Sequence, residues 1–289
     1  MSKQDLSWAV PVMRAGYAGR GLVYLVVAGF SLYAIWSGGE AKGTSSALAQ
    51  LETTGWGTVV LFLIMLGMAA YALWRYVDAF FDLEDYGADG EGLVARIGMV
   101  VTGTIHLGLG VAALLLLFTS GGSSGGGSGG DGSGDGSSIP KAVETVMSWP
   151  GGRWLVGLAG LATIGAGIYY AVKAVKEKYR ESLRANHFTT NYNWALKAGV
   201  FAQGVIITLI GGFFTYAAWR GNPEEAGGLD QAFSWLGEQI YGQALVVAVC
   251  VGLLGFALFC FVNAAYRIVP KASDPGVRTL GAKLKAAAT

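Results

Sequence analysis

Two sets of polar residues interrupt the apolar segments of this chain and could bind a charged ligand. Within an internally repeated pattern they occupy equivalent positions with unlike residues, whereas packing alone would keep such positions alike. Basic, acidic and amide groups placed in this way could bind an anionic lipid headgroup, an ion or a partner helix. The candidates are Arg20, Thr102 and Gln203 in the first set, and Asp78, Lys173 and Asn263 with the neighbouring Arg75 in the second.

Both sets are expected near the cytoplasmic ends of membrane helices. The first helix of each pair enters from the cytoplasm and the second returns there, so Arg20 and Asp78 should lie at a similar depth and could form an ion pair. Arg75 would lie one turn from Asp78. Structural pairing and snorkelling are the alternative interpretation, because long side chains at helix ends reach water at little cost.

His106 is predicted near the membrane midplane, where an ionisable group is unusual and often functional. We expect a neutral imidazole that is hydrogen-bonded to a neighbouring helix, and a proton relay is the sharper alternative. Ligation of haem or a metal ion would need a second ligand, and the other histidine, His187, is expected in a cytoplasmic loop.

No pattern in the sequence indicates an enzyme, a cofactor or a metal ion, and nucleic-acid binding has no support. Cys250 and Cys260 lie on different faces of one apolar helix, which excludes a mutual disulfide and suggests core packing. The Gly- and Ser-rich stretch 120–138 lacks the preceding strand and the Lys-bearing helix of a phosphate-binding loop. It is expected to be a flexible spacer.

The elements that position these residues form a threefold internal repeat. A basic residue opens each copy, a glycine follows two residues later and another five residues after that, and a second apolar helix begins near Gly57, Gly152 or Gly242. Small residues let helices approach closely in lipid, and the first helices of the three repeats could line a central axis. The predicted packing glycines are Gly16, Gly21, Gly98, Gly103, Gly199 and Gly204.

Composition identifies a membrane protein, because 53% of the 289 residues are hydrophobic and 13% are charged. Spanning a bilayer takes about 20 apolar residues. Six segments meet this length: about 16–36, 57–79, 97–118, 152–174, 198–219 and 242–266. We therefore predict an all-α polytopic membrane protein with one membrane domain. Its six transmembrane helices form three tandem hairpins with pseudo-threefold symmetry, in repeats at 14–82, 96–177 and 197–267 and with a basic cytoplasmic tail at 268–289.

The distribution of basic residues predicts the orientation. Of the 20 Lys and Arg residues, four lie on one side, at Lys42, Lys141, Arg153 and Arg220, and the rest lie on the side of the termini. Both termini are therefore expected in the cytoplasm. Three short apolar patterns, at 47–51, 142–146 and 232–236, predict amphipathic helices on the outer surface. Tryptophans at 36, 56, 149, 154, 219 and 235 predict an outer aromatic belt.

The repeated glycines, with Trp56-Gly57 and Trp149-Pro150-Gly151-Gly152 before the second helices, resemble the bacterial membrane family called domain of unknown function 1206. The resemblance covers about residues 14–267. It implies tandem two-helix repeats in a bacterial plasma (inner) membrane, and it implies no activity and no functional residues.

Three functions follow as hypotheses. A non-enzymatic scaffold that binds anionic lipid or a membrane-protein partner is favoured, because few polar residues are expected near the midplane. An ion or small-solute transporter or channel is the alternative, by analogy with the layout of mitochondrial carriers, which also have three two-helix repeats. An enzyme or redox protein is the least supported, because no nucleophile with a base and no paired midplane carboxylates occur.

Overall fold

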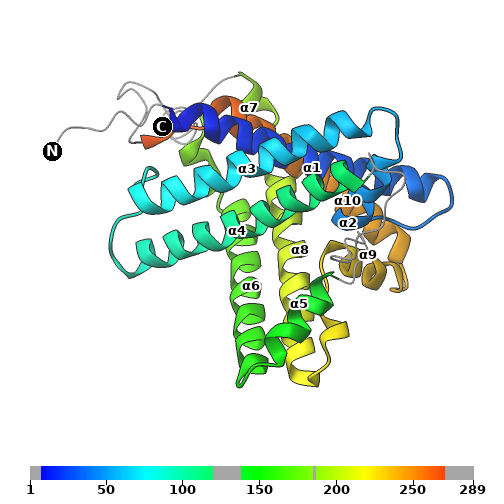
Figure 1. Cartoon of the computed structure of the whole chain (residues 1–289). Helices are drawn as coiled ribbons and strands as arrows, with labels where there is room; N and C mark the ends of the chain where they lie inside the picture. Colours follow the sequence, from blue (N-terminus) through cyan, green and yellow to red (C-terminus); the bar gives the residue numbers. More distant parts are fainter. Residues whose placement is uncertain (1–7, 120–137, 185–186, 271–289) are drawn as a thin grey trace.

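The computed structural model describes residues 8–119, 138–184 and 187–270, and these form an all-helical protein (Figure 1). The predicted spacer at 120–138 lies outside the described residues except for Ser138, and so does the tail beyond residue 270. The long helices are α1 (Ala9–Trp36), α3 (Gly57–Phe81), α4 (Gly90–Thr119), α6 (Gly152–Val175), α8 (Asn193–Arg220) and α10 (Gly242–Tyr266).

All six long helices are long and apolar enough to cross a membrane, which confirms the predicted multi-pass architecture. A helix satisfies its own backbone hydrogen bonds, as a segment in hydrocarbon must. The first helices of the repeats begin five to seven residues earlier than the sequence predicts, at Ala9, Gly90 and Asn193. This extra length changes the depth at which their polar residues lie.

The helices pack in a row that would close into a ring with one further contact. Along this row α4 packs on α3, α3 on α1, α1 on α10, α10 on α8, and α8 on α6. The two ends of the row, α4 and α6, are the two helices of the second repeat, and among the described residues they are not a packed pair. Figure 1 shows the reason, because α6 and α8 run across the direction of α1, α3 and α4.

Five of the six predicted packing glycines lie at helix interfaces. Gly16 and Gly199 contact the second helix of their own repeats, at Tyr71 and Gly255. Gly21, Gly103 and Gly204 instead contact the second helix of the preceding repeat in cyclic order, namely α10, α3 and α6. Gly98 is the exception, because a Cβ there would meet nothing within 4 Å. The expectation for Gly98 is therefore wrong in this structure, since α6 is not beside it.

The predicted central axis lined by the first helices is also wrong. The helices α1, α4 and α8 are not packed against one another; each lies instead between second helices or at the end of the row. The reason is the placement of the glycines, which direct each first helix towards second helices on both sides. Within the described residues the repeats therefore form an open row of alternating first and second helices.

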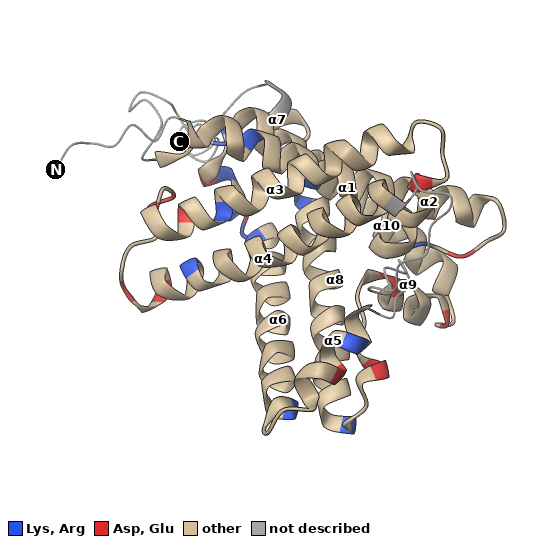
Figure 2. Ribbon diagram, viewed as in Figure 1, with Lys and Arg blue, Asp and Glu red and all other residues tan. Residues whose placement is uncertain are grey.

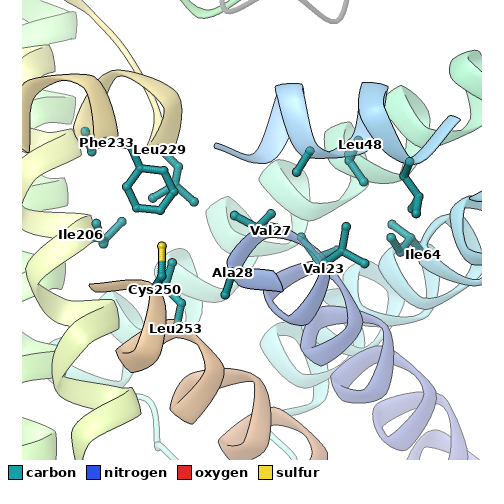
Figure 3. Close-up of a cluster of buried hydrophobic side chains, with 14 of the residues drawn as sticks. Val23, Val27, Ala28, Leu48, Ile64, Ile206, Leu229, Phe233, Cys250 and Leu253 are labelled. Atoms are coloured by element: carbon teal, nitrogen blue, oxygen red, sulfur yellow. The ribbon is translucent and has the colours of Figure 1, made fainter. Parts of the chain in front are cut away.

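Short helices precede each second helix, as the sequence predicts. They are α2 (Thr44–Glu52), α5 (Ser138–Met147) and α9 (Leu229–Gly237). Further short elements are η1 (Lys178–Ser182), α7 (His187–Asn191) and η2 (Pro223–Glu225). Figure 3 shows Leu48 of α2 and Phe233 of α9 in the same apolar core as Val27 of α1 and Leu253 of α10. The apolar faces of α2 and α9 are thus buried in protein rather than laid on lipid, because the ends of α1, α3 and α10 leave them a protein surface to cover.

The repeated glycines that begin the second helices have a common structural role. A Cβ at Gly57, Gly152 or Gly242 would collide with a backbone carbonyl at the end of the preceding short helix, at Leu51, Val146 or Gly237. The chain turns tightly there, since the amide of each glycine donates to the carbonyl three residues earlier. The threefold pattern of glycines thus fixes three equivalent turns between short and long helices.

Candidate functional site

Arg20 lies in the middle of the bundle and forms no ion pair among the described residues. Its side chain is buried, with 5% of the residue exposed. One terminal nitrogen donates a 2.9 Å hydrogen bond to the hydroxyl oxygen of Tyr71 on α3. The guanidinium also lies over three aromatic rings, with its Cζ 5.0 Å from the centroid of Phe256, 5.3 Å from Tyr71 and 5.7 Å from Tyr24. Its Nε has no hydrogen-bond partner among the described residues.

Two cations share the hydroxyl of Tyr71. Arg75, one turn further along α3, donates from Nε to the same oxygen at 3.0 Å and also reaches the hydroxyl of Tyr17. The Tyr71 oxygen thus accepts hydrogen bonds from two guanidinium groups. Two guanidinium groups lie close together here, away from water, where electrostatic interactions are weakly screened. They therefore give a positive potential around Arg20.

The predicted pairing of Arg20 with Asp78 does not occur. Gly19 touches Gly67 and Gly16 touches Tyr71, and these backbone contacts set the antiparallel register of α1 and α3. In this register Arg20 is level with Gly67, near the middle of α3, whereas Asp78 is level with Ala9. Arg20 therefore lies about three turns deeper than Asp78, and it faces Tyr71 instead of a carboxylate.

His106 and Gln203 join the same layer from α4 and α8. The imidazole of His106 is buried, with its ring centroid 4.6 Å from that of Tyr71. Its Nδ1 lies 2.7 Å from the carbonyl oxygen of Thr102 in its own helix, so the predicted hydrogen bond to a neighbouring helix is wrong. Gln203 donates to the hydroxyl of Tyr24 at 2.9 Å, and its Oε1 has no partner among the described residues.

Thr102 stands apart from the other members of the first set. Its hydroxyl donates to the carbonyl of Gly98 in the same helix at 2.6 Å, as threonines in membrane helices often do. The structure therefore brings Arg20 and Gln203 of this set together around Tyr24. Thr102 is connected to this layer only through the contact of its carbonyl oxygen with His106.

A second polar layer lies at the end of the bundle that holds the described chain ends. Arg267 follows α10 and pairs with Glu84 of the loop after α3, with nitrogen–oxygen distances of 2.6 and 2.7 Å. Both side chains are 6% exposed. Asn263 accepts a 2.6 Å hydrogen bond from Arg267. Asp78 accepts from the backbone amide of Glu84 and lies 3.8 Å from Arg75.

Lys173 of α6 contributes charge near this layer without a direct ion pair among the described contacts. Its ammonium lies 5.8 Å from the ring centroid of Tyr169 on its own helix. The second predicted set thus gathers around the Glu84 and Arg267 pair, with Asp78 and Asn263 in contact and Lys173 at the margin. Figure 2 shows most other charged residues at helix ends and in loops.

Sequence reasoning missed the residues that hold these layers together. Tyr71 and Phe256 occupy equivalent positions, fourteen residues after Gly57 and Gly242, and the third equivalent is Ala166. Tyr24 is likewise equivalent to His106 and Ile207. The criterion of unlike residues at equivalent positions would have found both triplets. Glu84 had no such signal, because it lies in an acidic loop outside the repeat.

The stability of the protein should depend on the ionisation of Glu84. Burial acts to raise the pKa of Glu84, but the guanidinium groups of Arg267 and Arg75 outweigh burial and lower it below its usual value. A carboxyl whose pKa is lower in the folded state stabilises the fold above its unfolded pKa of about 4.3. This contribution is lost as the pH falls through the folded pKa.

Acidification below about pH 4 should therefore lower the unfolding temperature in detergent. The Glu84→Gln protein should lack that part of the pH dependence, because it has no carboxyl to protonate at this position. An identical acid-induced loss of stability in both proteins would exclude Glu84 as the responsible group.

The comparisons with known proteins agree with a repeated fold and supply no activity. The chain matches the family described as Domain of Unknown Function (DUF1206) at residues 15–82, 97–177 and 198–267. It is similar to the uncharacterized protein YxxB of Bacillus subtilis (strain 168), with 26% identity over 271 residues that cover 92% of this chain and 94% of that protein. No solved structure matches.

Proposed function

Since the chain belongs to the DUF1206 family, whose description carries no activity, we infer its function from the site. We propose that the protein is a non-enzymatic transporter or channel for small anions. The observation that carries this proposal is Arg20, a buried arginine in the middle of a membrane bundle with no carboxylate partner among the described residues. An ionisable residue at such a depth is costly and marks a functional site by default.

The charge balance favours an anion with a single negative charge. In the layer at the end of the bundle, Arg75 and Arg267 are matched by Asp78 and Glu84. In the central layer Arg20 is unmatched, and the groups that it contacts directly are neutral, the Tyr71 hydroxyl and three aromatic rings among them. One guanidinium balances one negative charge, and its free Nε offers a donor for it.

The depth of the site separates this function from the scaffold that the sequence favours. That preference rests on the scarcity of polar residues near the midplane. With Arg20, Tyr24, Tyr71, His106 and Gln203 gathered mid-helix, the scarcity no longer holds. Transporter sites commonly lie near the midplane, where helices of different repeats meet.

The membrane and its orientation belong to the same proposal. The bias of basic residues towards the side of the termini supports cytoplasmic ends. Ala9 and Val269, which lie next to the two described ends, share one apolar cluster, which supports their location on the same side. The similarity to a Bacillus subtilis protein supports a bacterial plasma membrane.

The test is anion flux into liposomes that contain the purified protein. Chloride and nitrate should enter faster than into empty liposomes, and sulfate should enter more slowly than chloride. The Arg20→Gln protein should lose about 10- to 100-fold of the flux, because a hydrogen bond to a charged group contributes about 1.5–3 kcal/mol. Arg20→Lys should retain part of the flux, because it keeps the charge.

Arg14→Ala is the matched control, since Arg14 is an exposed arginine of the same helix. Wild-type flux in Arg20→Gln, or a wild-type protein with no flux, would contradict the proposal. Native mass spectrometry separates the scaffold from the transporter. Phosphatidylglycerol retained in an Arg20-dependent manner, without flux, would favour a lipid-binding scaffold.

A further inference from the structure

The second repeat differs from the other two in a way that its sequence does not explain. In the first repeat Gly19 contacts Gly67, and in the third Gly199 contacts Gly255, so the two helices of each hairpin touch backbone to backbone. In the second repeat, Gly98 on α4 is equivalent to Gly199, and Gly165 on α6 is equivalent to Gly255. A Cβ at either of these two glycines would meet nothing within 4 Å.

The unused faces of α4 and α6 have the chemistry of the packed hairpins. Gly98 and Gly165 are exposed, as are Val101 and Ala162, the equivalents of Gly19 and Gly67. The opposite faces of the same helices are already committed, because Gly103 packs on α3 and Gly167 packs on α8. Each unused face is therefore complementary to the other helix of the same repeat.

From these observations we infer that α4 and α6 form a lateral gate, which is open in this structure and closes when Gly98 meets Gly165. Closure completes the ring of six helices, with the second hairpin packed as the first and third already are. Repeat symmetry specifies both the contact and its register, which an apolar face alone would not do.

A bilayer favours the closed arrangement. Membrane helices tilt by about 20° on average and rarely beyond about 40° from the bilayer normal. Because α6 and α8 run across α1, α3 and α4, both groups cannot lie near the normal in the open arrangement (Figure 1). Swinging α6 and α8 alongside the others aligns all six helices that are long enough to span.

The contact between α8 and α10 is suited to act as the pivot. Gly199 and Gly255 touch through their backbones, and buried side chains such as Leu196 of α8 and Phe256 of α10 pack around this contact. The helices α6 and α8 together form an arm. This arm is rigid, because its two helices interlock through Gly160, Gly167, Gly204 and Gly211. Closure would turn this arm as one body about the crossing with α10 and would require the side chains packed around that crossing to rearrange.

The gate adjoins the central arginine. From α4, His106 packs at a tilt against the ring of Tyr71, and from α6, the ring centroid of Tyr170 lies 6.5 Å from that of Phe256. Tyr71 and Phe256 are the rings that flank Arg20. Closure thus surrounds Arg20 on the side of the second repeat, and this regulatory role rests on the proposed function.

The test is a disulfide between Gly98→Cys and Gly165→Cys in isolated membranes treated with a mild oxidant. Neither substitution meets an atom in the open structure, so the doubly substituted protein should fold. A disulfide needs Cβ atoms about 3.5–4.5 Å apart and forms only if the helices meet. We expect rapid formation within one chain, detected as linked peptides by mass spectrometry.

The matched control is Val100→Cys with Gly165→Cys. Val100 is 39% exposed and lies at nearly the depth of Gly98, but about 200° around α4. It should remain unlinked. Three outcomes would contradict the proposed gate: no disulfide in the Gly98 pair, an equal yield of disulfide in the Val100 pair, or a disulfide that links two chains.

The same protein separates the gate from the proposed function. The disulfide should reduce chloride flux to the level of empty liposomes, and a reductant should restore it. A disulfide formed in a protein whose wild type carries no flux would support the gate and reject the transporter. Flux through Arg20 that the disulfide leaves unchanged would reject the gating role.

Discussion

Replacing Glu84 by alanine is expected to lower the free energy of unfolding by about 3–5 kcal/mol, because it leaves a buried charge without its counter-ion. Two nitrogens of Arg267 bind one oxygen of the Glu84 carboxylate, and both side chains are 6% exposed. Without the carboxylate, Arg267 keeps a hydrogen bond to Asn263 but remains a buried charge without its counter-ion. Thermal unfolding in detergent at pH 7 measures the loss.

Two further proteins test the cause of this destabilisation. Glu181→Ala removes an exposed carboxyl from the other loop on the same side and should change stability by less than about 0.5 kcal/mol. Removing Glu84 and Arg267 together should cost less than the sum of the single changes, because no uncompensated charge is left. Additive losses would show that the two side chains act independently.

The Gly211→Ala protein is expected to lose about 1–3 kcal/mol of stability and the close packing of α8 on α6. A Cβ at Gly211 would lie 2.6 Å from the backbone nitrogen of Ile164 and 2.8 Å from the carbonyl oxygen of Gly160. Both are backbone atoms, which cannot move aside as a flexible side chain can. The helices must therefore separate, and in lipid little other than close packing holds them together.

Gly212→Ala is the control for this substitution. The residue is adjacent in α8, and a Cβ there would meet nothing within 4 Å. It should change stability by less than about 0.5 kcal/mol. Equal losses in the two proteins, measured by thermal unfolding, would mean that helix propensity rather than interhelical contact decides the result.

Gly98 and His106 illustrate the limit of reasoning from a repeat. Repeat symmetry places Gly98 on an interhelical face, and five of the six predicted glycines do contact another helix. The symmetry does not say whether all three hairpins are closed at once. His106 lies among the central residues, but its Nδ1 bonds to its own helix because the carbonyl of Thr102 is one turn away.

Arg20 shows how a small error in register changes a functional argument. The sequence places it near the cytoplasmic end beside Asp78, and the structure places it mid-helix beside Tyr71. The difference arises because α1 begins at Ala9 and because Gly19 meets Gly67. No pattern within α1 alone determines which residue of α3 lies opposite.

The six helices, their pairing into three repeats, the short helices before each second helix and most of the glycines at interfaces follow from the amino-acid sequence alone. These features are local, because in lipid each helix satisfies its own backbone and its apolar length sets its span. Three features become visible only in the folded chain: which polar residues meet, the pairing of Glu84 with Arg267, and the open second hairpin. Such features depend on the register and crossing of helices far apart in the chain, which are set by backbone contacts between complementary faces rather than by the pattern of either helix.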